Sequence, residues 1–525
     1  MTEKTGDILH GATGFLYGIS NENVPTTNTL IPLKPKVLAT KGALGTEHPY
    51  GDALDVAETF LEAGGEQIQM YNSNYYAVVN PTAHPEDYAD VLENIIAPEV
   101  RKWEEEDPEY RKGKLVYVPI NEGTPTGHGY SFNEAWKLYY NAIKRAHPDA
   151  LIAGPNEPQY DVNTIYNFLV YTKQNNCVPD VITWHELESS DLPWIYDNVK
   201  RVRNWMRELD IPERKIVINE YGPAVDLGVP GRLVNRIARH EDAKVYGCLA
   251  FWHQANNLND LAADANVGNS AWWVYKWYGD ISGQTLKVET RNTTFDGLYG
   301  LASIDDNKKI SNVIFGGVDG EAKIVLDKID QTIPFSGADK VHVKIEAAYF
   351  SGFHGAVNEP DTILEGTYPV KNGRLIIDMK DMTFSTAYNI TVTAARDDEE
   401  VDNPRIGKFR AVYEAEKAEL LGNASVAGMG WYYASGRQYV KNILNDGDGL
   451  VYTINVPMDG KYKLEFVYAN GVGANSQSET LHNPLNLTQT LSIDGNDPIV
   501  MNMKSTLLSE MTGIHTEYVN LTAGE

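Results

Sequence analysis

The feature that most constrains the fold is a regular alternation of short apolar runs with amphipathic stretches over residues 10–281. Eight of these runs are rich in β-branched or aromatic residues and end in polar loops, which is typical of parallel strands. They are Gly14–Ile19, Lys36–Thr40, Gln67–Tyr71, Lys114–Ile120, Leu151–Gly154, Asp180–Trp184, Lys215–Asn219 and Val245–Phe251. Eight strand–helix repeats in about 280 residues predict an α/β fold, a (β/α)8 barrel (TIM barrel).

Signals for helix ends between the predicted strands support the barrel. Asp52–Ala63 places its apolar residues on one stripe and stops at Gly64–Gly65, as a helix ending in glycine does. Ser131 and Glu134 form the pattern of a capping box. A doubly wound dinucleotide-binding fold lacks its main signal, because no GxGxxG follows the first strand.

Beyond Asp280 the sequence predicts two all-β domains. Alternating runs between Asp, Asn and Gly turns indicate a β-sandwich over residues 282–396. These runs are Lys323–Leu326, Val341–Ile345, Arg374–Ile377 and Tyr388–Thr393. We interpret Asp397–Asp402 as an acidic linker. A second β-sandwich over residues 410–525 has its clearest strands at Leu450–Val456 and Tyr462–Tyr468, and we expect it to be truncated because the chain stops without a terminating element.

Composition excludes several classes of function. The 72 acidic residues outnumber the 45 basic ones and give a net charge of −27, which argues against a nucleic-acid partner. No apolar run is long enough for a membrane span, and Met1–His10 has neither a basic start nor an apolar stretch, so we expect neither a span nor a signal peptide in the sequence as given. The two cysteines, Cys177 and Cys248, are too few for a disulfide framework or a cysteine metal cluster. The acidic run Glu104–Asp107 is expected to be a solvated helix face.

Two carboxylates stand at the ends of predicted barrel strands, where functional residues of such barrels lie. Asn121–Glu122 closes the fourth strand and Asn219–Glu220 closes the seventh. Cleavage of a glycosidic bond needs such a pair, because one carboxyl group protonates the leaving oxygen while the other attacks or directs water. A solvated or salt-bridged position is the alternative for each glutamate, but two Asn–Glu pairs at strand ends favour catalysis.

These residues resemble clan A glycoside hydrolases, together with Trp184–His185 after the sixth strand and Trp252 after the eighth. The segments Leu151–Pro155, Thr183–Glu186 and Ile218–Tyr221, with the trailing β-sandwich, look most like family 39. Over residues 10–395 the resemblance implies that Glu122 is the general acid/base, that Glu220 is the nucleophile and that Asn121 bonds the sugar 2-hydroxyl. It also implies that the anomeric configuration is retained.

One departure concerns the acid. The clan's more literal Asn–Glu–Pro signature occurs at Asn156–Glu157–Pro158, whereas Gly123 follows Glu122. We favour Glu122, because Glu157 lies three residues beyond its predicted strand, after Gly154–Pro155, where a loop is expected. Glu157 remains a candidate for the substrate site.

The mechanism sets two further expectations. Burial and the like charge of Glu220 are expected to raise the affinity of Glu122 for its proton. Retention requires the two carboxyl groups to lie about 5 to 5.5 Å apart. Trp252 is the best candidate for stacking on a sugar, with Trp184 or Tyr71 as a second wall and His185 as a polar contact; core packing is the alternative for these aromatic residues.

A metal-dependent hydrolase is the less favoured alternative. His48, His128, His185 and His253 all follow predicted strands, but no His-x-His or His-Glu-x-x-His motif occurs. We therefore expect no cofactor for catalysis.

The C-terminal domain resembles carbohydrate-binding modules of families 35 and 6. The resemblance rests on Tyr413–Glu416, Ala434–Gly436, Gly460–Tyr462 and Tyr468–Gly471. It implies a structural calcium with Glu414 and Glu416 as candidate ligands; solvation at a strand edge is the alternative. A sugar-binding module on a linker would hold an enzyme near a polymer.

The sequence thus predicts an extracellular or cell-surface retaining glycoside hydrolase with an oligo- or polysaccharide partner. Leading substrates are α-L-arabinofuranosides, β-xylosides and β-galactosides on plant-type polysaccharide or glycan side chains. The main alternative is a catalytically silent carbohydrate-binding protein.

Overall fold

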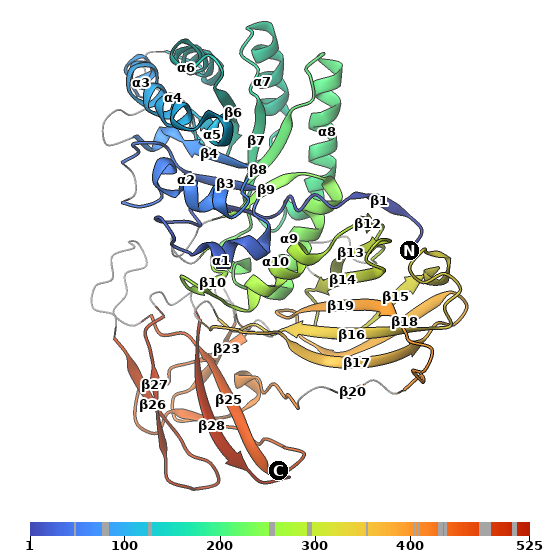
Figure 1. The fold of residues 1–525 in the computed structure, drawn as a ribbon. Coiled ribbons are helices and arrows are strands. Elements are labelled where there is room, and N and C mark those ends of the chain that lie inside the picture. The colour runs from blue at the N-terminus through green and yellow to red at the C-terminus, as the bar shows by residue number, and fades with distance from the viewer. Residues whose placement is uncertain are drawn as a thin grey trace.

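Three parts follow one another along the chain in this computed structural model: a barrel, a β-sandwich and a C-terminal β-domain (Figure 1). The structure describes residues 1–46, 49–75, 83–123, 129–250, 258–290, 297–352, 355–402, 405–406, 409–428, 434, 438–471, 485–506 and 512–524.

The first part is a closed barrel of eight parallel strands. Its strands are β2 (Gly14–Leu16), β3 (Val37–Lys41), β4 (Gln67–Tyr71), β5 (Leu115–Val118), β6 (Leu151–Glu157), β7 (Val181–Glu186), β8 (Lys215–Tyr221) and β9 (Tyr246–Leu249). All eight predicted runs are therefore confirmed as barrel strands, and β6, β7 and β8 continue two or three residues further than predicted.

Helices surround the barrel. They are α1 (Thr27–Leu30), α2 (Ala53–Glu62), α3 (Pro85–Val91), α4 (Ala97–Glu106), α5 (Pro108–Arg111), α6 (Phe132–Ala146), α7 (Val162–Gln174), α8 (Ile195–Glu208), α9 (Pro230–Ala243) and α10 (Ser270–Asp280). The predicted capping box is present at α6, where Ser131 accepts from the Glu134 amide and Glu134 accepts from the Ser131 amide. Asp52 caps α2 by accepting from the Leu54 amide at 3.0 Å.

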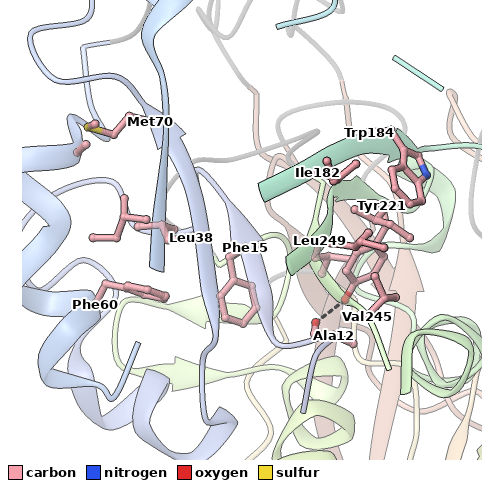
Figure 2. Close-up of a cluster of buried hydrophobic side chains, with 14 of the residues drawn as sticks. Ala12, Phe15, Leu38, Phe60, Met70, Ile182, Trp184, Tyr221, Val245 and Leu249 are labelled. Atoms are coloured by element: carbon pink, nitrogen blue, oxygen red, sulfur yellow. Dashed lines mark hydrogen bonds between the residues drawn. The ribbon is translucent and has the colours of Figure 1, made fainter. Parts of the chain in front are cut away.

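Alternate residues of each strand serve two cores. Small and β-branched side chains, among them Val37, Val116 and Val217, fill the inside of the barrel. Larger apolar side chains face the helices, and Figure 2 shows part of this outer core, where the Tyr221 hydroxyl donates to the Ala12 carbonyl at 2.7 Å. A packed interior leaves the carboxyl ends of the strands as the place for a site.

The second part is a β-sandwich. Its large sheet has the order β1-β12-β13-β14-β19-β16-β17-β20, and β15 and β18 form the facing pair. The strands are β1 (Lys4–Asp7), β12 (Gln284–Leu286), β13 (Tyr299–Asp305), β14 (Ile310–Gly316), β15 (Gly320–Asp327), β16 (Lys340–Ala348), β17 (Asp361–Pro369), β18 (Arg374–Met382), β19 (Ala387–Ala394) and β20 (Arg405–Ile406). The sheet thus includes β1 and β20, which lie outside the predicted range 282–396.

The acidic segment after the sandwich packs on it. Thr367 of β17 donates from its hydroxyl to Glu399 at 2.8 Å and from its amide to Asp402 at 3.1 Å. Lys340 of β16 donates to the Asp397 carbonyl at 3.1 Å. The prediction of a free linker over Asp397–Asp402 is therefore wrong, because these hydrogen bonds hold the segment against β16 and β17.

The third part consists of antiparallel strand pairs. They pair as β21 (Glu419–Leu421) with β24 (Gly449–Val451), β22 (Ser425–Gly428) with β23 (Gln438–Lys441), β25 (Gly460–Tyr468) with β28 (Gly513–Leu521), and β26 (Leu487–Leu491) with β27 (Ile499–Met503). Arg410 stacks on the Tyr349 ring of the sandwich at 3.6 Å. None of the helices among the described residues is long and apolar enough to cross a membrane.

Candidate active site

Glu122 and Glu220 meet at the carboxyl end of the barrel, on either side of His185. The Nδ1 atom of His185 lies 2.8 Å from Glu122 Oε1, and its Nε2 atom lies 3.6 Å from Glu220 Oε1. One oxygen of each carboxylate and one ring nitrogen all lie within 4.8 Å of one another. The structure thus brings together the two carboxylates that the sequence singled out.

A β-bulge aims Glu220 into the barrel. In the pairing of β7 with β8, Trp184 lies opposite Ile218 and His185 lies opposite Glu220, so Asn219 is an extra residue in β8. Without it, strict alternation would turn Glu220 toward the helices with Ile218. The extra residue places the Glu220 carboxylate on the side of His185.

Glu122 is the more exposed carboxylate, with 41% of its side chain accessible against 13% for Glu220. The hydrogen bond from His185 lowers the pKa of Glu122 despite the opposing effect of partial burial. The expectation that Glu122 has a raised affinity for its proton is therefore wrong, because the imidazole stabilises the carboxylate form.

Tyr71 contacts Glu220. Its hydroxyl donates to Glu220 Oε1 at 3.0 Å, and its ring packs edge-on against Tyr17. Burial, followed by the charge of Glu220, raises the pKa of Tyr71 well above its ordinary value, so the phenol stays a donor. The ring is 1% exposed, so the prediction that Tyr71 forms a wall for sugar is wrong; its hydroxyl holds the carboxylate instead.

A chain of buried amides lies beneath the carboxylates. Asn219 Nδ2 donates to Gln69 Oε1 at 2.9 Å and to Asn156 Oδ1 at 2.5 Å. Asn156 Nδ2 donates to Asn121 Oδ1 at 2.6 Å and lies 3.3 Å from His185 Nε2. Asn121, predicted to bond a sugar hydroxyl, is half-buried at the top of this chain. Sequence reasoning missed Asn156 and Gln69, although the Asn–Glu–Pro signature marked the position of Asn156.

The turn that carries Glu122 is tied to β6. Glu122 and Asn156 have left-handed backbones, with φ of 52° and 65°. The Glu122 amide donates to the Asn156 carbonyl at 3.2 Å. Left-handed residues other than glycine are costly and persist where the surroundings hold them, a pattern common at active sites.

Glu157 is the last residue of β6, half-buried. The expected loop at Gly154–Pro155 is wrong, because β6 continues through both residues. Burial raises the pKa of Glu157. Glu157 is not part of the cluster of Glu122, His185 and Glu220, although the charge of His185 acts on it, and the preference for Glu122 as the acid stays a prediction.

Trp184 is not available to a ligand. Its side chain is fully buried, its indole donates to Glu186 at 2.9 Å, and its ring lies in the outer core (Figure 2). The prediction of a stacking wall at Trp184 is therefore wrong. Period-two alternation could have shown this, since Trp184 shares a strand face with Ile182 and His185 shares one with Thr183. Trp252 lies outside the described residues, as do His48, His128 and His253.

Potential metal ligands gather at the same place. Glu122, His185 and Glu220 are the one group of three acidic, cysteine or histidine side chains found close together in the described part of the chain. Glu414 and Glu416 lie in and beside the short 3-10 turn Ala415–Lys417, both half-buried. No third acidic or histidine side chain joins them among the residues that the structure describes.

Comparison with solved structures shows a similarity at the level of both sequence and fold. N2152 from Neocallimastix frontalis is 30% identical, with a TM-score of 0.64, and the match covers 75% of this chain and 98% of N2152. The chain belongs to the same family as N2152. No protein-family model matches the chain.

Two curated relatives carry names that describe glycosidases. The 3-O-α-D-galactosyl-α-L-arabinofuranosidase of Bifidobacterium longum subsp. longum is 29% identical over 539 residues, which cover 89% of this chain and 47% of the relative. The 3-O-β-L-arabinopyranosyl-α-L-arabinofuranosidase of Bifidobacterium pseudocatenulatum is 28% identical and covers 89% of this chain and 55% of the relative. The chain spans about half the length of these relatives. Like N2152, both are homologues of this chain; its assignment to family 39 stays a prediction.

Proposed function

We propose that the protein is a retaining glycoside hydrolase that removes arabinofuranosyl or related units from glycan side chains. The observation that carries the proposal is the pair Glu122 and Glu220, with oxygens within 4.8 Å across His185 at the carboxyl end of the barrel. This spacing supports retention, since retaining pairs lie about 5 to 5.5 Å apart and inverting pairs lie about 6.5 to 9.5 Å apart.

The two carboxylates divide the reaction. Glu220 attacks the anomeric carbon while Glu122 donates a proton to the leaving oxygen, which gives a glycosyl ester on Glu220. Glu122, now ionised, takes a proton from water as the water attacks the same carbon, and Glu220 is released as a carboxylate. The Tyr71 hydroxyl orients Glu220, and its raised pKa keeps it protonated throughout.

Substrate binding opposes the effect of His185 on Glu122. A sugar over the exposed side of Glu122 removes water from that carboxylate, and desolvation raises the pKa of a carboxyl group. His185 then favours the return to the carboxylate after the proton has left, because its Nδ1 is positioned to donate to Glu122.

The substrate class follows from the relatives. Both are named for arabinofuranosides that carry a further sugar at O3. We infer an arabinofuranosyl unit, free or substituted at O3, as the preferred glycone, with β-xylosides and β-galactosides as weaker alternatives. We propose that Asn121 bonds the 2-hydroxyl of this unit through Nδ2, since its Oδ1 accepts from Asn156.

The C-terminal domain supports action on a polymer. We propose that it binds sugar and that Glu414 and Glu416 contribute to a calcium site, a hard cation that prefers oxygen ligands. An enzyme that works on plant-type polysaccharide in this way acts outside the cell or at its surface.

A panel of nitrophenyl glycosides and plant arabinogalactans tests the proposal. We expect release from α-L-arabinofuranosides or from arabinogalactan, with a first-formed product of the same anomeric configuration as the substrate by proton NMR. A first-formed product of inverted configuration would contradict the double displacement. Binding without hydrolysis of any glycan would instead indicate a silent carbohydrate-binding protein.

A metal-dependent hydrolase is the second candidate, favoured by the donor set of Glu122, His185 and Glu220. One imidazole and two carboxylates suit a divalent transition metal. Complete loss of hydrolysis on dialysis against a chelator, with recovery on adding zinc, would favour this candidate; full activity in chelator favours the two-carboxylate mechanism.

A further inference from the structure

Asn156 is a fully buried polar residue with two contacts in the site. It donates to Asn121, the candidate partner of the sugar, and lies beside His185, which bonds the acid Glu122. We propose that it is a positioning residue: its amide fixes which ring nitrogen of His185 carries the proton and which end of the Asn121 amide faces the substrate. The proposal rests on the proposed function, because it gives Asn156 a part in the work of Glu122.

The orientation of the Asn156 amide is set from below. Asn219 Nδ2 donates to its Oδ1 atom at 2.5 Å, so the oxygen points down toward Asn219 and the nitrogen points up toward Asn121 and His185. Asn219 has a second donor hydrogen, which goes to Gln69 at 2.9 Å. The series of hydrogen bonds therefore has one direction: the Asn219 nitrogen donates to the oxygens of Gln69 and Asn156, and the Asn156 nitrogen donates to the oxygen of Asn121.

This direction decides the state of His185. A neutral imidazole has one protonated nitrogen and one acceptor nitrogen. Because Nε2 faces the Asn156 amino group at 3.3 Å, Nε2 is the acceptor and Nδ1 carries the proton. Nδ1 lies 2.8 Å from Glu122 and donates to it. With the proton on Nε2 instead, that proton would face the Asn156 amino group at 3.3 Å, with Glu220 Oε1 further away at 3.6 Å, and Glu122 would lose its donor.

The same amide orients Asn121. Asn121 Oδ1 accepts from Asn156 at 2.6 Å, so Nδ2 is the end of the Asn121 amide that this hydrogen bond does not use. On this proposal a sugar hydroxyl bound at Asn121 meets a donor. Asn156 thus determines which atom donates and which accepts at two places, His185 beside the acid and Asn121 beside the substrate.

Asparagine suits this position for a second reason. The backbone of Asn156 is left-handed, with φ of 65°, a conformation that Asn and Asp adopt more readily than other side chains with a Cβ. Asn156→Asp therefore keeps the shape and the backbone while it replaces the donor nitrogen by an acceptor oxygen. Asn163→Asp is the matched control, since Asn163 is exposed in the first turn of α7 and adds the same charge.

The experiment reads the histidine directly. The protein is labelled with 15N-histidine, and the ring-nitrogen shifts of His185, assigned by their absence in His185→Gln, report which nitrogen is protonated. We expect a protonated Nδ1 and an unprotonated Nε2 in the unmodified protein and in Asn163→Asp. In Asn156→Asp we expect a protonated Nε2, because the new carboxylate accepts from it.

Activity provides the second measurement. We expect kcat/KM on an activated glycoside to fall about 10- to 100-fold in Asn156→Asp, as for other residues that orient a catalytic group, and to stay unchanged in Asn163→Asp. A protonated Nε2 in the unmodified protein, an unchanged His185 in Asn156→Asp, or full activity of that variant would each overturn the proposal.

The proposed function and the role of Asn156 can be tested separately. If the unmodified protein hydrolyses no glycoside, the proposed function is wrong, while the nitrogen shifts still decide the role of Asn156. If Asn156→Asp does not fold, the protonation of His185 in the unmodified protein decides alone.

Discussion

Among the described residues of the barrel, two histidine–glutamate pairs have similar distances and different surroundings. At the strand ends, His185 lies 2.8 Å from Glu122, whose side chain is 41% exposed. Outside the barrel wall, between β5, α4 and α6, His147 lies 3.2 Å from Glu104, and both side chains are less than one-tenth exposed. Tyr117 occupies the other nitrogen of His147 at 3.1 Å.

The difference shows that a histidine–glutamate pair alone says little about function. His147 faces a phenol on its second nitrogen and no opening, so its pair ties a strand to two helices. His185 faces a second carboxylate, Glu220, and one of its partners reaches solvent. What distinguishes the candidate catalytic pair from the structural pair is a second carboxylate beside the histidine and a glutamate that solvent can reach. Substitutions at the two places should therefore change different quantities.

The largest expected effect follows from Glu220→Gly. Removal of the nucleophile should lower kcat by about 10⁴-fold or more. Azide should restore turnover of an activated α-L-arabinofuranoside, because it enters the space of the lost carboxylate and attacks the anomeric carbon. The product is then a glycosyl azide of inverted configuration. Glu104→Gln, the matched change at the structural pair, should leave kcat/KM within about twofold of the unmodified protein. A loss of activity as large as that of Glu220→Gly would contradict the division into a catalytic and a structural pair.

The next effect concerns the acid. Glu122→Gln should lower kcat/KM by about 10²- to 10⁴-fold on substrates with poor leaving groups, and much less on nitrophenyl glycosides, which need no protonation. Glu157→Gln should cost less than Glu122→Gln on the poor leaving groups. The reverse order would make Glu157 the acid.

A smaller effect is expected from His185→Phe. Since the hydrogen bond from His185 lowers the pKa of Glu122, its removal raises that pKa. The acid then keeps its proton to higher pH, so the alkaline limb of kcat/KM should move up by on the order of one pH unit. Profiles of kcat/KM against pH for both proteins measure the shift. A downward shift would mean that His185 does not stabilise the Glu122 carboxylate.

The structural pair should respond in stability. His147→Phe leaves the Tyr117 hydroxyl and the Glu104 carboxylate buried without their shared partner. The loss of unfolding free energy should be about 3–5 kcal/mol, with kcat/KM unchanged in the folded protein. Denaturant unfolding followed by tryptophan fluorescence measures the first and initial rates the second. An active-site defect without loss of stability would contradict the comparison.

These two pairs also show what the sequence can predict. The barrel strands were predictable because each buried strand is a continuous apolar run, and Glu122 and Glu220 were predictable because polar residues that follow such runs lie at the open end. Glu104 was not, since an acidic run on a helix gives no sign of which residue faces the wall. Its burial beside His147 makes the expectation of a solvated face wrong at that residue.

Within the site, the sequence does not predict the contacts between strands that orient the side chains. The extra residue Asn219 and the left-handed Asn156 determine how Glu220 and Glu122 point, and both depend on pairing with neighbouring strands. No local pattern encodes this pairing. The buried amides were missed for the same reason, because an asparagine at a strand end gives no sign of its partner on another strand.

Glu186 sharpens the comparison, because it is a buried carboxylate with neither a histidine nor an opening. It follows His185 in β7 and accepts at Oε1 from Trp184 at 2.9 Å and from Asn198 at 3.1 Å. Burial raises its pKa to about 7. The folded protein thus binds this proton more tightly than the unfolded chain does, and the group's contribution to stability is lost as pH rises from about 4.5 to 7.

Glu186→Gln keeps Oε1 for both donors and carries no charge at any pH. It should stabilise the barrel by about 2–3 kcal/mol at pH 8, where the wild-type carboxylate is buried and ionised, and by little at pH 4.5, where it is protonated. Calorimetric unfolding of the two proteins at both pH values measures the difference. Equal effects at the two values would show that Glu186 does not titrate within the fold. A loss of activity in this variant would instead indicate that Glu186 takes part in the work of the active site around His185.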